Sequence, residues 1–104
     1  MIMTIVTFQL PKPTTLAEIT KTFQSTAPKY RNIPGLLRKN YWVSEDGRRA
    51  GGVYFWESRA DAERLFNAEW RKFGKEKYGV EPNLEYLHAP VMVDNLEGKI
   101  SVAA

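Results

Sequence analysis

The spacing of hydrophobic residues along the chain alternates between the period of a strand and the period of a helix. Strand-like patterns cover residues 2–10, 36–56 and 81–95, and the middle stretch is long enough for two strands. Helical spacing covers residues 16–27 and 59–73. The predicted order of elements is therefore β-α-β-β-α-β.

Residues that favour element ends mark the predicted boundaries. Thr15 begins a capping box with the glutamate three residues later, so the first helix is expected to start there. Pro28 should end or kink that helix. Ser58 is placed to cap the second helix, and Gly74 or Gly79 should end it.

An Asp-Gly pair at 46–47 predicts a hairpin, because this dipeptide favours tight turns with positive φ. If the turn is symmetric, Tyr41 lies opposite Gly52 and Trp42 lies opposite Gly51. A turn with a bulge would shift this register by one residue. The two glycines either leave space for a ligand or make space for these two rings, and the sequence leaves both explanations open.

Neither face of this hairpin is simply polar. Leu37, Tyr41, Tyr54 and Trp56 share one face, and Trp42 shares the other with apolar and polar neighbours. With right-handed crossovers, the element order gives a ferredoxin-like antiparallel sheet with both helices on one face. We expect a second subunit to cover the other face, so that two sheets pack together in a homodimer.

The length of 104 residues and the hydrophobic content of 43% fit a single α+β domain, which we expect to span residues 1–95. Pro90 lies within the last strand pattern and predicts an edge position or a bulge. Asn95 and Gly98 would interrupt any further regular element. Residues 96–104 are therefore expected to form a C-terminal tail.

Composition narrows the possible partners. The net charge is +3, but acids and bases are interleaved along the second helix, which indicates a solvated surface and argues against nucleic acid. With no cysteine and one histidine, we expect no disulfide, no thiolate catalysis and no metal site. No hydrophobic run is long enough to cross a membrane and the first residues lack signal-peptide features, so we expect a cytoplasmic protein.

Four segments carry a resemblance to a known family: IPGLLRK at 33–39, AGGVYFWES at 50–58, EWR at 69–71 and KYG at 77–79. They resemble the YdhR-type monooxygenases of the dimeric α+β barrel superfamily, which also contains the antibiotic-biosynthesis monooxygenases. The resemblance extends in element order over residues 4–95. It implies ferredoxin-like subunits that pair into a dimeric α+β barrel.

The resemblance also implies a type of chemistry. Better-understood relatives oxygenate aromatic or quinol-like substrates with O₂ and without metal or flavin, so no cofactor is expected. Trp56 matches a tryptophan that those relatives carry at the end of the third strand. Gly52 stands where they carry an asparagine, and Ala62 stands near their tyrosine position. The second helix lacks the histidine that haem-degrading relatives use as an iron ligand, which argues against haem.

Aromatic residues supply the candidate substrate site. Tyr41, Tyr54 and Trp56 either form the wall of a cavity for a small aromatic molecule or pack as ordinary core. Gly52 would leave space in such a cavity. Trp70 belongs to the apolar stripe of the second helix, and its indole N–H needs a partner, which a ligand could supply.

Polar residues supply the other candidates. His88 is the one side chain whose ordinary pKa suits a general base near neutral pH, although a surface histidine is the simpler explanation. Trp56 joins it as a candidate catalytic residue through the resemblance. Arg38, Asn40 and Trp42 lie on the other hairpin face, where we expect a dimer interface in preference to a second site.

Three functions fit these patterns. The first is a cofactor-independent monooxygenase that acts on a small aromatic or polycyclic phenol or quinol. The second is a non-catalytic small-molecule-binding or stress-related homodimer that uses the same cavity. The third is a structural module whose only task is to pair.

Overall fold

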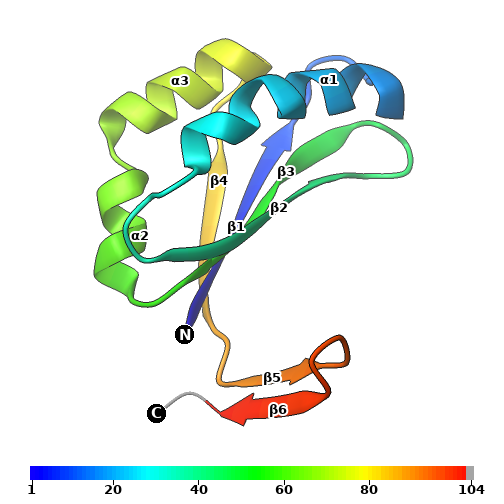
Figure 1. Ribbon diagram of the computed structural model, residues 1–104. Helices are drawn as coiled ribbons and strands as arrows, with labels where there is room; N and C mark the ends of the chain where they lie inside the picture. Colours follow the sequence, from blue (N-terminus) through cyan, green and yellow to red (C-terminus); the bar gives the residue numbers. More distant parts are fainter. Residues whose placement is uncertain (103–104) are drawn as a thin grey trace.

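The computed structural model, which describes residues 1–102, has a four-stranded antiparallel sheet with all its helices on one face (Figure 1). The strand order is β2-β3-β1-β4, which confirms the predicted ferredoxin-like α+β class. The elements are β1 Ile2–Gln9, α1 Leu16–Thr26, the 3₁₀-helix η1 Ala27–Tyr30, β2 Leu36–Val43, β3 Arg49–Trp56, α2 Arg59–Leu65, α3 Ala68–Tyr78, β4 Asn83–His88, β5 Val91–Asp94 and β6 Lys99–Val102.

The first helix begins and ends where the sequence predicts. The Thr15 side chain accepts a hydrogen bond from the backbone N–H of Glu18 at 3.2 Å, and its hydroxyl donates to the Glu18 carboxylate at 2.9 Å. The α-helix ends at Thr26, and Pro28 lies in the first turn of η1. The proline cannot donate a hydrogen bond to the preceding turn, so the chain tightens into a 3₁₀-helix there.

The hairpin of β2 and β3 has the predicted register. Tyr41 pairs with Gly52 and Trp42 pairs with Gly51. Gly47 has a φ of 71°, a conformation that glycine adopts without steric penalty, and the hairpin turns there as predicted. This register places the two glycines in the middle of the sheet.

The face of the hairpin changes near its open end. Leu36 pairs with Trp56 but Arg38 pairs with Phe55, so Leu37 is an extra residue in a β-bulge. Leu36 therefore packs against the core, while Leu37 is 53% exposed. The prediction that Leu37 shares the face of Tyr41 is wrong, because the bulge reverses the alternation at this point.

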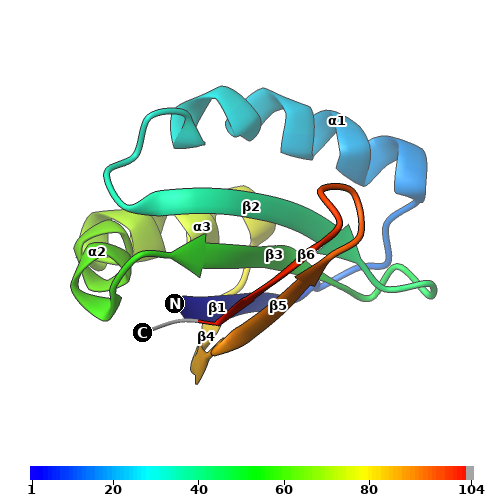
Figure 2. The same ribbon diagram turned by 60° about the horizontal axis from the view of Figure 1, so that its bottom comes forward.

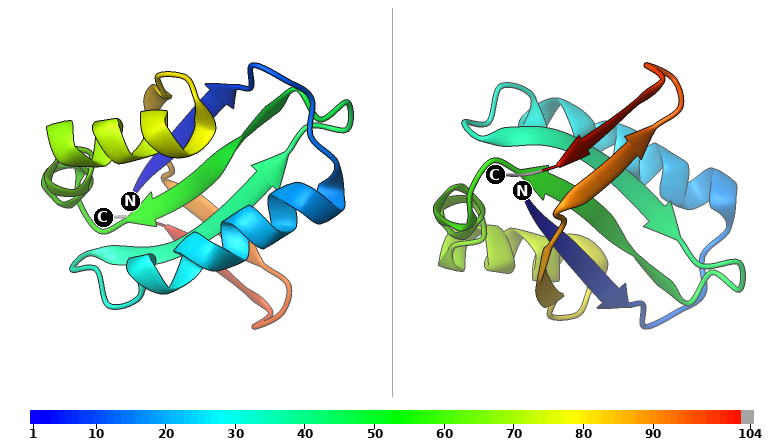
Figure 3. Two further views of the ribbon diagram at one scale, coloured as in Figure 1. Left: turned by 90° about the horizontal axis from the view of Figure 1, so that it is seen from above. Right: turned by 90° about the horizontal axis from the view of Figure 1, so that it is seen from below.

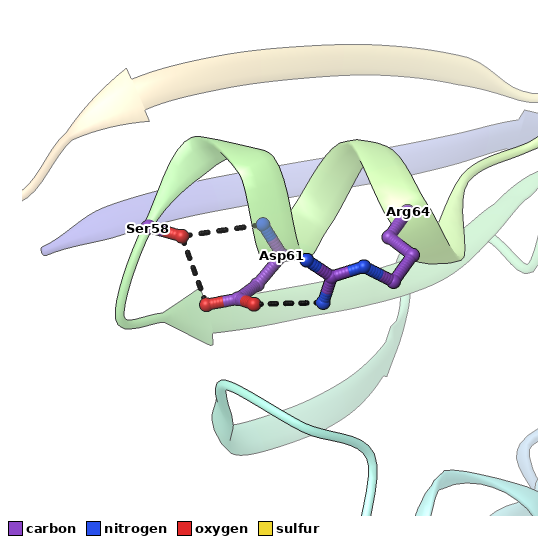
Figure 4. Close-up of polar contacts among 3 residues, drawn as sticks. All are labelled: Ser58, Asp61 and Arg64. Carbon is purple, nitrogen blue, oxygen red and sulfur yellow. Dashed lines mark hydrogen bonds and ion pairs between the residues drawn. The ribbon is translucent and has the colours of Figure 1, made fainter.

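The predicted second helix is in fact two helices. Ser58 caps α2 as predicted, since its side chain accepts from the backbone N–H of Asp61 at 3.2 Å (Figure 4). The same hydroxyl donates to the Asp61 carboxylate, which also accepts from Arg64 at 2.9 Å. After Leu65 the chain leaves helical geometry for two residues, and α3 then begins in a new direction.

The break between α2 and α3 is fixed by Asn67. Its side-chain oxygen accepts from the backbone N–H of Trp70 at 2.9 Å, so it serves as the N-cap of α3. Gly79 ends α3 with a φ of 78°, which decides between the two predicted glycines. Gly74 instead lies inside α3, where a β-carbon would come within 3.0 Å of the Phe8 ring.

The C-terminal part of the chain differs from the prediction of one strand and a tail. β4 is an edge strand and ends at His88, and the chain turns near Pro90. The following residues form a separate hairpin of β5 and β6, with Gly98 at a φ of 67° in its turn. Gly98 was expected to interrupt regular structure, but its positive φ permits the turn that connects β5 to β6. The last two residues of the predicted tail lie outside the described residues.

The sheet separates a packed side from an open side. The core lies between the sheet and the helices, and its buried side chains are Val6, Phe8, Tyr54, Trp56, Ala62, Phe66 and Trp70. Within residues 1–102, no helix covers the opposite face, and the β5–β6 hairpin crosses in front of it (Figures 2 and 3). Among the described residues, no helix is long and apolar enough to cross a membrane.

Replacing Asn67 with alanine should lower the free energy of unfolding by about 1 kcal/mol, because the cap of α3 loses its acceptor. Asn67→Asp keeps an acceptor at the same position and should retain most of the stability. Urea denaturation followed by circular dichroism measures both variants. If the alanine variant is as stable as the parent, Asn67 does not determine the break between the two helices.

Candidate functional site

A small cavity lies between the helices and the middle of the sheet. Its free volume is about 20 Å³, which is space for a single water molecule. Residues of α1, η1, β2, β3 and α3 form its wall. They include Thr26, Tyr30, Lys39, Tyr41, Gly52, Tyr54, Trp70 and Tyr78.

The amine of Lys39 occupies the centre of an aromatic cage. Its Nζ lies 3.3 Å from the centroid of the Tyr30 ring, 3.8 Å from that of Tyr41 and 4.7 Å from that of Tyr54. These rings come from η1, β2 and β3, so three separate elements meet around one nitrogen. The cavity is therefore an aromatic chamber in which Lys39 is the one basic residue of the described lining.

Gly52 makes this arrangement possible. A β-carbon at this position would lie 3.0 Å from a ring carbon of Tyr54 and 3.1 Å from Cε of Lys39. A β-carbon on Gly51 would collide with the backbone oxygen of Val6 and would lie 3.2 Å from the Trp42 ring. Gly51 thus accommodates the neighbouring strand and Trp42, whereas Gly52 accommodates the lysine and tyrosine of the cage.

Hydrogen bonds hold the aromatic walls in place. The indole N–H of Trp70 donates to the Tyr30 hydroxyl at 3.0 Å, so its partner is a protein side chain. The hydroxyls of Tyr41 and Thr26 lie 2.7 Å apart and share a hydrogen bond. The rings are fixed from α1 and α3, and the cage does not depend on a bound molecule for its shape.

Burial controls the protonation of the cage. Removal of the amine from water, with a smaller contribution from the positive charge of Lys29, lowers the pKa of Lys39 to about 6. The faces of the three rings attract an ammonium and oppose this loss of charge, but burial has the larger effect. Burial also raises the pKa of Tyr30 and Tyr54, so both phenols are neutral at physiological pH.

An open groove adjoins the cavity on its outer side. Its volume is about 310 Å³, and the two spaces share Tyr30, Lys39 and Tyr41 as their common wall. Arg31 and Arg38 line the groove. No acidic residue lines either space among the described residues. The described walls of both spaces therefore consist of aromatic, basic and uncharged side chains.

The structure brings together four of the predicted substrate-binding residues. Tyr41, Gly52, Tyr54 and Trp70 all line the cavity. Trp56 stacks against Tyr54, with ring centroids 6.1 Å apart, but it is 0% exposed and does not line the cavity. Its indole N–H has no hydrogen-bond partner among the described residues.

His88 lies apart from this group. It is exposed at the end of β4, opposite Ile2, and lines neither the cavity nor the groove. The predicted interface residues Arg38 and Asn40 are exposed on β2. On the same strand, Trp42 buries an indole N–H that has no partner in the described part of the chain.

Lys39 is the functional candidate that the sequence pattern did not single out. It shares the hairpin face of Tyr41 and Tyr54, and a charged residue among uncharged aliphatic and aromatic neighbours was the available signal. A lysine in a strand usually points its amine to water, so the sequence alone did not predict that the Lys39 amine points inward. Residues 1–102 contain no group of three or more side chains of the types that hold a metal ion.

The sequence places the chain in a family. Residues 3–81 match the sequence profile of the family described as "Putative mono-oxygenase ydhR". No curated protein matches the chain. The family match covers the sheet up to the turn before β4 and all of the helices, and it therefore includes every residue of the cavity.

Solved structures share the fold at low sequence identity. An antibiotic biosynthesis monooxygenase is 15% identical with a TM-score of 0.64, and the match covers 86% of this chain and 98% of that chain. The monooxygenase from the gene ActVA-Orf6 of Streptomyces coelicolor, in complex with Nanaomycin D, is 21% identical, with a TM-score of 0.64 and coverage of 85% and 86%. A variant of SnoaB, a cofactor-independent oxygenase from Streptomyces nogalater, is 15% identical, with a TM-score of 0.62 and coverage of 85% and 91%.

Replacing Lys39 with methionine should change how stability depends on pH. Above a pKa of about 6 the folded chain releases this proton, while the unfolded chain keeps it up to about 10.5. The free energy of unfolding of the parent should therefore rise with pH, by up to about 1.4 kcal/mol per unit, relative to Lys39→Met.

Urea denaturation at several values between about pH 6.5 and pH 9 measures this difference, in a window below the ionisation of tyrosine. Lys21→Met, which removes an exposed amine of α1, is the matched control and should follow the parent. Parallel curves for the parent and Lys39→Met would contradict a neutral amine in the cage.

Proposed function

Because the chain belongs to the YdhR family, described as putative mono-oxygenases, we propose that it is a cofactor-independent monooxygenase acting on a small aromatic phenol or quinol. The observation that carries this proposal is the chamber of three tyrosine rings around a single amine. The Streptomyces nogalater relative is called a cofactor-independent oxygenase, and the Streptomyces coelicolor relative holds a ligand. Both facts support the same class of reaction.

In such a reaction the substrate itself supplies the electrons. The ionised substrate gives four electrons to O₂: a ring C–H bond is replaced by a bond to one oxygen atom, the other oxygen atom leaves as water, and the oxidised product is a quinone. The protein has to hold the ring, exclude water and favour the ionised form of the hydroxyl. None of these tasks needs a metal or a flavin.

The cavity residues take separate parts in this proposal. Tyr41 borders the ring, Tyr54 and Trp70 form the wall behind Lys39, and Gly52, which stands where the better-understood relatives carry an asparagine, leaves room for that lysine. The free volume of the cavity is smaller than an aromatic ring, so the ring lies in the outer groove and Lys39 stays in the wall between the two spaces. Trp56 supports the wall from behind Tyr54.

The predicted role of His88 as the base has less support than the predicted roles of the cavity residues. Its exposed position at the end of β4 leaves it outside both spaces. A general base has to lie within hydrogen-bond reach of the proton that it removes. The proposal therefore needs a proton acceptor from the wall of the cavity.

The second candidate function is a non-catalytic homodimer that binds a small molecule. Two observations favour it: the small volume of the closed cavity, and the glycine and alanine at positions 52 and 62. In this case an aromatic ligand would raise the melting temperature and no O₂ would be consumed. A purely structural module would show neither effect.

Oxygen uptake by the purified, metal-free protein tests the oxygenase directly. With a panel of mono- and polycyclic quinols, we expect consumption above the buffer rate for at least one substrate. Gly52→Val should reduce that rate at least ten-fold, because the added side chain meets Tyr54 and Lys39. Glu45→Val, in the hairpin turn, is the matched control and should keep the parental rate.

Ligand binding separates the two candidate functions. If no member of the panel raises O₂ consumption but some raise the melting temperature, the oxygenase is excluded and the binding function is supported. If the panel produces neither consumption nor a thermal shift, both functions of the cavity are excluded.

We further propose that two copies of the chain form a homodimer through the open face of the sheet. The face presents Ile5, Val53 and Phe55, which no helix of the described chain covers, together with the exposed Arg38 and Asn40. One face of the nearby hairpin is also apolar and exposed. Its residues are Val91, Val93, Ile100 and Val102.

The combined apolar surface of the sheet and the hairpin suits a second copy of the same surface. The side chains of Val93 and Ile100 are 63% and 69% exposed, although they sit opposite each other in the hairpin. Exposed apolar residues that are adjacent in space mark interaction surfaces. A twofold arrangement would cover both surfaces at once.

Light scattering at micromolar concentration should give the mass of a dimer. The double variant Val93→Lys/Ile100→Lys should shift the mass toward a monomer, because two charges would be buried at the interface. Asn95→Lys adds a charge in the hairpin turn and should remain dimeric. A monomeric mass for the parent chain would contradict the proposed assembly.

A further inference from the structure

The position of Lys39 has a consequence beyond its contact with the three rings. The residue stands in the wall between the closed cavity and the outer groove, together with Tyr30 and Tyr41. Lys39 therefore borders both the groove that a molecule would enter and the cavity behind it. A flexible four-carbon stem lets that amine follow a ligand over a few ångströms.

Among the described residues, no acidic side chain lies against the Lys39 amine. No carboxylate of the described residues forms an ion pair with Lys39, and neither space has an acidic residue in its described lining. The titratable and charged groups near it are Lys29 and Tyr30 on η1, Arg31 after η1, Arg38 and Tyr41 on β2, Tyr54 on β3 and Tyr78 on α3. Each of these is a cation or a neutral phenol.

We propose that Lys39 is the catalytic base of this site and that it takes the proton of a phenol bound in the groove beside it. This inference rests on the proposed oxygenase function and names its missing proton acceptor. The geometry supports it, because the amine lines both the space that can hold a ring and the space enclosed by the aromatic cage.

The proton transfer is a simple exchange of bonds. The O–H bond of the phenol breaks and its electron pair stays on oxygen, while the lone pair of Nζ forms a new N–H bond. The products are a phenolate and an ammonium. Neither molecule is oxidised or reduced, so the step needs no further reactant. Oxygen then reacts with the phenolate as in the proposed function.

The cage favours both the start and the end of this step. In the resting protein, burial and the nearby charge of Lys29 favour the neutral amine, which is the form that accepts a proton. After the transfer, the faces of Tyr30, Tyr41 and Tyr54 lie against the new ammonium and stabilise it. Arg31 lines the groove, where its charge would stabilise the phenolate.

The other ionisable groups of the region are poorer acceptors. Burial raises the pKa of Tyr30, Tyr41 and Tyr54, so these residues remain protonated at neutral pH. Arg31 and Arg38 are always charged and cannot accept a proton. His88 lines neither space. Within the described residues, Lys39 is the group that combines the right position with the right protonation.

An anaerobic experiment with para-nitrophenol tests the base without any turnover. Its ionised form absorbs visible light, so the spectrum reports the protonation of the bound molecule. About one pH unit below the pKa of the free phenol, the parent protein should bind it as the phenolate. Lys39→Met should bind only the neutral form or fail to bind, whereas Lys21→Met should behave like the parent.

Lys39→Gln guards against a fold defect, because it keeps a long polar side chain but neither accepts a proton at neutral pH nor carries a charge that would stabilise a phenolate. If the glutamine variant has a parental melting temperature and does not ionise the phenol, the inference is supported. If the parent binds the neutral phenol, does not bind it at all, or ionises it equally well as Lys39→Met, the inference is overturned.

Oxygen uptake then separates Lys39 from the oxygenase proposal. With a quinol of ordinary acidity, Lys39→Met should reduce kcat/KM about 10²- to 10⁴-fold, the usual contribution of a general base. With a quinol already ionised at the assay pH, the loss should shrink to less than about ten-fold, because no base is then needed. An equal loss with both quinols would overturn the inference. Phenol ionisation without any O₂ uptake would exclude the oxygenase and leave Lys39 as the base of a binding site.

Discussion

The packing of Lys39 and Tyr54 over the missing side chain of Gly52 is the contact on which the whole site depends. A β-carbon at position 52 would come within 3.0–3.1 Å of both neighbours, so it would displace the ring or the lysine stem. The register of the hairpin brings these residues together, and Tyr30 and Tyr41 then complete the cage. One glycine thus links the pairing of two strands to the protonation of a buried amine.

The same sheet has one face packed against helices and one face without such a layer in the described chain. Its helices and aromatic core occupy one face, and the opposite face carries apolar strand residues behind a hairpin whose aliphatic side chains are exposed. The buried indole N–H of Trp42 lies on that open side without a partner among the described residues. The cavity and the proposed dimer interface therefore lie on opposite faces of the sheet. A substitution on one face can be tested without altering the other face.

Local signals predicted much of the fold. The Asp-Gly turn at 46–47 predicted the hairpin and left two registers open, of which the structure has the symmetric one. The caps at Thr15 and Ser58 gave correct helix starts. The sequence interpretation missed the break at Asn67, because the apolar stripe continues across it. It also took Gly98 as the end of structure, although a glycine with positive φ serves equally well inside a hairpin turn. The aromatic site residues were predictable from their shared face, but the inward path of Lys39 depends on tertiary packing.

The protonation of Lys39 is the most direct measure of this account. With isotope-labelled lysine in the protein, nuclear magnetic resonance can follow the chemical shift of each lysine ε-carbon as a function of pH. The signal of Lys39 is identified as the one that is absent from the spectrum of Lys39→Met. The account predicts a midpoint near 6 for Lys39, far below the midpoints of the exposed lysines. A midpoint close to 10.5, together with the other lysines, would mean a permanently charged cage and would contradict the proposed base.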